Sequence, residues 1–214
     1  MSTTIVTDND RERIKAAIQS AERTTSGEIV VVVAYRSDDY LHVPLHVATA
    51  AALAVPLLLP LVSRFLHWYP TPIAWVFVYQ LVTFIVVALA LSIPPLRYYI
   101  TPRALMRKYA HRHASAQFLA SNIHTTRART GVLIFVSLLE RYCEIVADIA
   151  VSEKVPKRTW RVIIDQILPR IKAGDLAAGL ETGIARCAEH LSKHFPPGAL
   201  NLNELPDHLI VIRG

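Results

Sequence analysis

Residues 73–93 read IAWVFVYQLVTFIVVALALSI, a run of 21 residues without a charged side chain. A second uncharged run, residues 45–63, reads LHVATAAALAVPLLLPLVS and has 19 residues. A helix of about 20 apolar residues is long enough to cross the hydrocarbon core of a bilayer. The two runs therefore predict a hairpin of two transmembrane helices, which we place within residues 42–96.

Two other structures are compatible with these runs. A pair of buried core helices in a soluble protein would also be apolar, but core helices seldom keep runs this long free of charge. Pro56 and Pro60 leave a kinked or re-entrant path open for the first run, although membrane helices tolerate proline better than soluble ones. The second run is therefore the firmer membrane helix of the two.

The charge of the chain is concentrated beside the hairpin. The 214 residues are 52% apolar and 19% charged, which excludes a disordered protein, and the net charge is +6. Residues 40–139 contain eight Lys and Arg and no Asp or Glu, so the rest of the chain has 23 − 8 = 15 basic against 17 acidic residues. Because no nucleic-acid motif or stacking platform accompanies this charge, we expect no nucleic-acid partner.

Five basic residues follow the second apolar run directly, whereas the hairpin link has only Arg64. By the positive-inside rule, both termini are expected in the cytoplasm and the link outside. At an anionic leaflet each basic side chain adds an attraction on the order of 1 kcal/mol, so anionic lipid is the expected partner. The predicted membrane-surface residues are Arg97, Arg103, Arg107, Lys108 and Arg112.

The remaining residues alternate between helix and strand signals. Continuous apolar runs at residues 28–35 (EIVVVVAY), 131–138 (GVLIFVSL) and 142–150 (YCEIVADIA), with a short run at 207–213, predict strands. Helices are expected from Thr7 or Asp8, after Thr101-Pro102, from Pro156 and after Gly174-Asp175. The predicted fold is α/β, a small mixed sheet flanked by helices, with residues 1–41 and 97–214 forming one domain that the hairpin at 42–96 interrupts.

Several short motifs lie around these strands and helices. They are Thr25-Ser26-Gly27-Glu28 before the valine run, Thr130-Gly131, Glu140-Arg141, Trp160 with Ile163-Ile164, and the glycines at 174, 179 and 183. With these motifs the chain resembles the TPM domain family, and in particular its uncharacterised bacterial membrane type, which is related to the TPM phosphatases of the thylakoid lumen. The resemblance implies an α/β fold and a multi-pass protein of the bacterial inner membrane.

Some TPM proteins have acid phosphatase activity or bind calcium, so the resemblance makes both functions candidates for this chain. Asp38 and Asp39 follow the first strand, Asp148 and Glu153 follow the third, and ligands of open α/β sheets gather beyond strand ends. These four carboxylates are the candidate ligands for a divalent ion such as calcium. The alternative is that they are ordinary solvated residues of turns. Residues 147–154 lack the glycines of the enzymatic relatives, which puts phosphatase activity in doubt.

Three functions stay open. The first is a non-enzymatic interaction or complex-stabilising module on the cytoplasmic face, with a membrane protein as partner. The alternatives are a divalent-metal-dependent acid phosphatase and a regulator that senses lipid or a small ligand. No catalytic residue is assigned, because nothing activates Ser137, and the histidines of His111-Arg112-His113 are expected on a solvated basic face. Cys143 and Cys187 are expected as buried thiols, and alanines in residues 48–54 would permit homo-oligomers.

Overall fold

A computed structural model describes residues 6–65, 72–197, 205 and 209–212. The chain divides into two compact units, one made of residues 1–38 with 106–214 and the other of residues 39–105. The boundaries expected from the sequence, 41/42 and 96/97, are three and nine residues from these divisions.

The first unit is built on a four-stranded sheet in the order β3-β2-β1-β4. Its strands are β1 (Ile29–Ala34), β2 (Val132–Ser137), β3 (Tyr142–Ala147) and β4 (Ile210–Ile212). β1 pairs in parallel with β2 and β4, and β3 pairs antiparallel with β2. All residues of β1 and β2 are buried, as their continuous apolar runs predict. The predicted mixed sheet is therefore confirmed.

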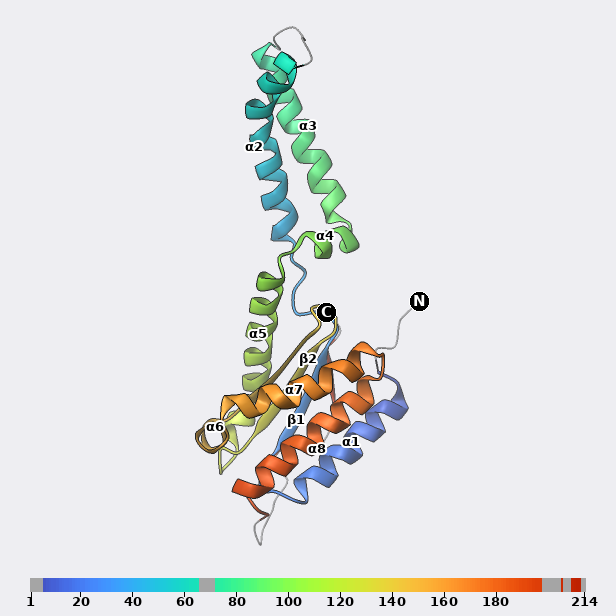
Figure 1. The fold of residues 1–214 in the computed structure, drawn as a ribbon, viewed down its shortest axis with the longest axis vertical. Helices are drawn as coiled ribbons and strands as arrows, with labels where there is room; N and C mark the ends of the chain where they lie inside the picture. The colour runs from blue at the N-terminus through green and yellow to red at the C-terminus, as the bar shows by residue number, and fades with distance from the viewer. Residues whose placement is uncertain (1–5, 66–71, 198–204, 206–208, 213–214) are drawn as a thin grey trace. The chain divides into compact units, whose positions relative to one another are not determined.

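Helices cover both faces of this sheet (Figure 1). On one face lie α1 (Asp8–Glu22), α7 (Lys157–Lys172) and α8 (Leu176–His194), and on the other lies α5 (Arg103–Ala120). Successive β1 residues alternate between the two sides: Val31 belongs to the core with the three helices, and Val32 to the core that includes Ala114 of α5. The predicted α/β layering, with helices flanking the sheet, is confirmed.

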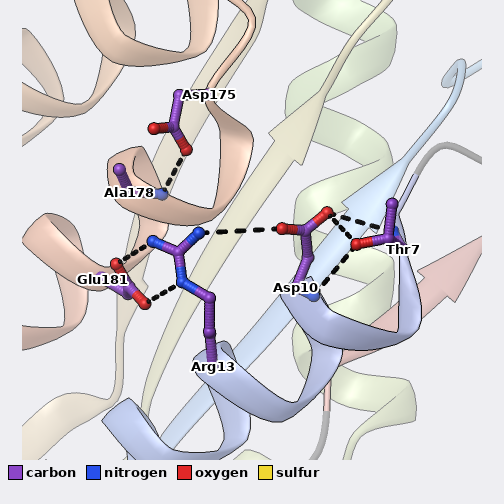
Figure 2. A network of polar contacts seen from close by, with 6 residues as sticks. All are labelled: Thr7, Asp10, Arg13, Asp175, Ala178 and Glu181. Atoms are coloured by element: carbon purple, nitrogen blue, oxygen red, sulfur yellow. Dashed lines mark hydrogen bonds and ion pairs between the residues drawn. The ribbon is translucent and has the colours of Figure 1, made fainter.

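Polar contacts fix α1 against α8 (Figure 2). Thr7 caps α1 in a capping box with Asp10, and hydrogen bonds from Thr7 lower the pKa of the Asp10 carboxyl. Arg13 of α1 donates two hydrogen bonds, of 2.9 and 2.7 Å, to the carboxylate of Glu181 on α8. Asp175 caps the N-terminus of α8. The helix start expected at Thr7 or Asp8 is thus confirmed, with Thr7 as the capping residue.

The third strand ends earlier than its sequence predicts. β3 stops at Ala147, and the short helix α6 (Ile149–Lys154) follows where the apolar run suggested more strand. The reason is Asp148, whose carboxylate accepts a hydrogen bond of 2.7 Å from the N–H of Ile149 and caps the helix. Glu153 therefore lies on a helix and not in a loop.

The second unit consists of α2 (His42–Phe65), α3 (Ile73–Ser92) and the short α4 (Pro94–Ile100), which the sequence did not predict. α2 continues through Pro56 and Pro60 as one helix. By length and composition, both α2 and α3 could cross a membrane. α3 has no buried residue, whereas a core helix of a soluble protein would be mostly buried. This exposure favours membrane helices over the soluble alternative.

Candidate functional site

The two pairs of candidate metal ligands lie at opposite ends of the sheet. The last residues of β1 and β2 pair as Ala34 with Ser137, and Ser137 pairs in turn with Tyr142, the first residue of β3. Because β3 runs antiparallel, its end at Ala147 lies at the other end of β2. Asp38 and Asp148 therefore follow strand ends that are separated by a six-residue strand, roughly 16 Å. The strand directions do not bring the four carboxylates to one ion.

Asp148 already has partners within the chain. It is 3% exposed, and Arg129 donates hydrogen bonds of 2.7 and 2.9 Å to its two carboxylate oxygens. The same contact raises the pKa of Arg129 above its ordinary value. Glu153 is exposed on α6. In residues 6–65, 72–197, 205 and 209–212, no group of three or more His, Cys, Asp or Glu side chains could hold a metal ion.

A polar cluster that the sequence did not predict lies where β1 and β2 end. We call Ser37, Ser137, Glu140 and His113 the carboxyl-edge cluster. One Glu140 oxygen accepts a hydrogen bond of 2.9 Å from the N–H of Ser37, and the other accepts one from the Ser137 hydroxyl. The Ser37 hydroxyl donates to the Ser137 hydroxyl at 3.0 Å. Ser137 is fully buried, so its hydroxyl holds the strand ends together and is not presented to a substrate.

His113 is the member of this cluster that lies on α5. Its ring lies 5.5 Å from the ring of Phe135 on β2, centroid to centroid. Burial lowers the pKa of the imidazole, and the negative charges of Glu140 and Asp38 partly oppose this shift. Its Nδ1 atom is buried and makes no hydrogen bond to the described residues. Burial thus favours the neutral imidazole and the two carboxylates favour the charged one, an arrangement that only the parallel pairing of β1 and β2 creates.

The neighbouring histidine behaves differently. His111 Nδ1 lies 2.9 Å from a carboxylate oxygen of Glu144 on β3. His111 is exposed, as expected of a solvated face, whereas His113 is half-buried and departs from that expectation. Residues two apart on a helix point in different directions, and His111 and His113 accordingly contact different strands. Glu144 is 33 residues from His111 in sequence, and its position opposite α5 follows from the β2–β3 pairing.

The predicted membrane-surface residues divide into two groups. Arg103, Arg107, Lys108 and Arg112 are exposed along α5. Arg97 is 6% exposed, and its guanidinium lies 5.4 Å from the centroid of the Tyr98 ring. Four of the five residues are therefore exposed, whereas Arg97 is buried; the exposed Arg112 makes a similar cation–π contact, 5.4 Å from the centroid of the Tyr109 ring.

Both cysteines are buried and free, as expected. Burial raises the pKa of the Cys143 thiol to about 12 and raises that of Cys187 as well. A thiol that stays protonated is a poor nucleophile, so neither cysteine is a candidate catalytic residue.

Comparisons with known proteins agree with this fold. The family model described as the TPM domain matches residues 98–190, which span α5 to α8 and include β2 and β3. The structure is similar to the NMR structure of BA42 protein from the psychrophilic bacterium Bizionia argentinensis, with a TM-score of 0.60 and 18% identity over 100% of this chain and 99% of the other. A comparison with curated proteins found no matching relative. The resemblance to the TPM domain family is therefore confirmed, and the structural similarity shows the fold.

Proposed function

We propose that the protein is a membrane-anchored TPM-domain protein whose α/β unit acts as a non-enzymatic binding module on the cytoplasmic face. The observation that carries this proposal is the pairing of Asp148 with Arg129, which commits the most buried candidate ligand to a structural contact. Ser137 and Glu140 are similarly joined to each other at the opposite end of the sheet. These contacts therefore favour a unit that binds a partner through its surface over a unit with a reactive centre.

The orientation of this module rests on the charges beside α3. Arg103, Arg107, Lys108 and Arg112 are exposed on α5, which follows the second apolar helix, and positive charge is retained on the cytoplasmic side of membrane proteins. The two native thiols are buried, so single added cysteines report topology with little background. In a bacterial host, Phe65→Cys should react with a membrane-impermeant maleimide in intact cells, and Glu12→Cys only after lysis. The reverse pattern would overturn the orientation.

The binding role is tested by cross-linking in native membranes followed by purification of the full chain. We expect a defined membrane protein to be captured at a constant ratio to the bait. The matched control is a variant with its α/β unit unfolded by Gly131→Val, because a Cβ on Gly131 collides with Ile123. Equal capture by this variant would show that the hairpin alone recruits the partner and would contradict a binding role for the unit.

A divalent-ion-dependent phosphatase is the second candidate, and the carboxyl-edge cluster favours it. Asp38 and Glu140 both act electrostatically on His113, at an edge of parallel strands where ligands commonly bind. Hydrolysis of p-nitrophenyl phosphate with calcium or magnesium, lost in Asp38→Asn, would support this candidate. No hydrolysis by a chain with an unchanged melting temperature would support the binding module.

Lipid sensing is the third candidate. Lys108 and Arg112 lie one turn apart on α5, and both are exposed, so they can contact the same lipid headgroups. In nanodiscs, anionic lipid should slow hydrogen exchange along α5 in the full chain, and Lys108→Glu with Arg112→Glu should remove this effect. Exchange that is indifferent to lipid charge would contradict the contact.

A further inference from the structure

The outer edge of β3 is open. β3 is the last strand in the sheet order, and within the described residues no strand pairs with its outer side. The register with β2, together with the bond from Asp148 N–H to the Gly131 carbonyl, directs the backbone groups of residues 142, 144 and 146 toward β2. The backbone N–H and C=O groups of Cys143 and Ile145 therefore point outward. Such a row is a template for another extended chain.

A groove of about 530 Å³ follows this edge. His111 and Ser115 of α5 form one wall, and Trp160, Arg161 and Ile164 of α7 form the other. Because side chains of an extended segment alternate, a chain laid beside β3 would direct successive side chains to the α5 wall and the α7 wall in turn. The groove therefore has the shape that strand addition requires.

The charges around the groove indicate which kind of extended segment would bind there. Lys157 and Arg161 are exposed on α7 and form no ion pair with the described residues. On the α5 side, the positive charge of Arg107 acts on Tyr142 of β3 and favours the ionised form of its hydroxyl. The acidic residue of the groove, Glu144, is engaged: His111 lies 2.9 Å away and the Tyr142 hydroxyl donates to it at 2.8 Å. An acidic segment is therefore complementary to this groove. A second copy of the chain would oppose the same cations.

We propose that the β3 groove binds an extended acidic segment of a partner protein by strand addition. Acidic side chains at alternating positions would face Lys157 and Arg161 on the α7 wall, and small apolar side chains at the others would face His111 and Ser115 on the α5 wall. This inference rests on the proposed binding function and names the site and the partner chemistry for it. The outward backbone groups of Cys143 and Ile145 supply the hydrogen bonds.

The test uses the full chain in a neutral detergent and a fluorescent peptide, Gly-Ser-Glu-Val-Glu-Val-Glu-Val-Ser-Gly, followed by fluorescence anisotropy. We expect saturable binding that weakens with added NaCl, and at least tenfold weaker binding when Lys replaces each Glu. Arg161→Glu should weaken binding about tenfold. Its matched control is Arg158→Glu, which makes the same charge change at an exposed position of the same helix outside the groove. Equal losses in the two variants would overturn the proposal.

The backbone contribution is tested on the peptide, so that no variant needs to fold. N-methylation of the three Val residues and N-methylation of the three Glu residues block opposite edges of the same extended chain. Strand addition predicts that one of these peptides loses binding at least tenfold and that the other is much less affected. Unchanged binding of both peptides would overturn strand addition.

Partner capture from native membranes separates this inference from the proposed function. Capture by the wild-type chain that falls in Arg161→Glu and not in Arg158→Glu supports the β3 groove as the binding site. Equal capture by all three chains leaves the binding function standing and overturns the groove. Absence of any captured partner with the wild-type chain overturns the proposed function, whatever the peptide does.

Discussion

The glycine at position 183 should be replaceable only if the residue facing it becomes smaller. A Cβ placed on Gly183 of α8 would lie 2.5 Å from Cδ1 and 3.0 Å from Cγ1 of Ile167 on α7, and 3.8 Å from Ile134 Cδ1. Ile167 is fully buried, so its side chain has no solvent into which it can move. Gly183→Ala therefore forces Ile167 into a different rotamer inside the core.

The expected sizes follow from the geometry. Alanine improves helix propensity over glycine by about 1 kcal/mol, whereas overpacking a core costs about 1–3 kcal/mol, so Gly183→Ala should destabilise by about 1 kcal/mol. Ile167→Val should cost about 1 kcal/mol by itself. In the valine background the closest atom, Cδ1, is absent, and Gly183→Ala should be neutral or stabilising. The two changes should thus be coupled by about 1–2 kcal/mol.

The buried cysteines provide the assay. A thiol-reactive coumarin dye reports unfolding of the full chain in detergent, because Cys143 and Cys187 become accessible only when the α/β unit opens. For a domain of this size 1 kcal/mol shifts the melting temperature by about 2–4 °C. Each single variant should therefore melt about 2–4 °C lower, and the double variant no lower than Ile167→Val. Strictly additive shifts would refute the argument that Ile167 requires a glycine at position 183.

Three further predictions concern the candidate site. Asp148→Ala should lower the melting temperature by about 2–4 °C or more, because a helix cap alone contributes about 1 kcal/mol. The loss should be the same with and without calcium, and a calcium-dependent difference would contradict the structural role of Asp148. Burial lowers the pKa of His113 from its ordinary 6.5, so the unfolded chain binds a proton on this residue more readily than the folded chain does. The contribution of His113 to stability is therefore fully present above pH 6.5, and it is lost as the pH falls from 6.5 through the lower pKa of the folded chain. His113→Gln should therefore lose less stability than wild type between pH 7.5 and 5.5, and parallel pH profiles would disprove this. Finally, neither Cys143 nor Cys187 should react with Ellman's reagent at pH 8 before denaturation, because both thiols are buried and their pKa values are raised; rapid reaction of either in the folded chain would show that its burial is wrong.

The secondary structure was largely predictable because its signals are local. The runs that became β1 and β2 consist of apolar, mostly β-branched residues, and the caps at Thr7 and Asp175 stand directly before their helices. The end of β3 was misplaced for a local reason too: Asp148 can close a strand or cap a helix, and its contact with Arg129, 19 residues away in sequence, accompanies the second role.

The candidate site was less predictable because it depends on strand direction. Four carboxylates that follow strands looked like one ligand set, and the antiparallel course of β3 placed them at two ends of the sheet. The pairing of β1 with β2 instead joined Ser37 to Ser137 and Glu140, which lie about a hundred residues along the chain. No local pattern marks such contacts, since they arise only when distant strands are placed side by side.

The sequence by itself determined two apolar helices long enough to cross a membrane, the cations that follow them, and the strands and helices of an α/β unit. These features depend on composition and spacing within short segments, where each residue interacts with near neighbours or with the surrounding medium. Only the tertiary structure decided that Asp148 is paired with Arg129, that His113 is half-buried at the carboxyl-edge cluster, and that β3 has an open edge beside Arg161. Those features depend on strand order and direction, because the free energy of each contact is gained between segments that the chain brings together only on folding.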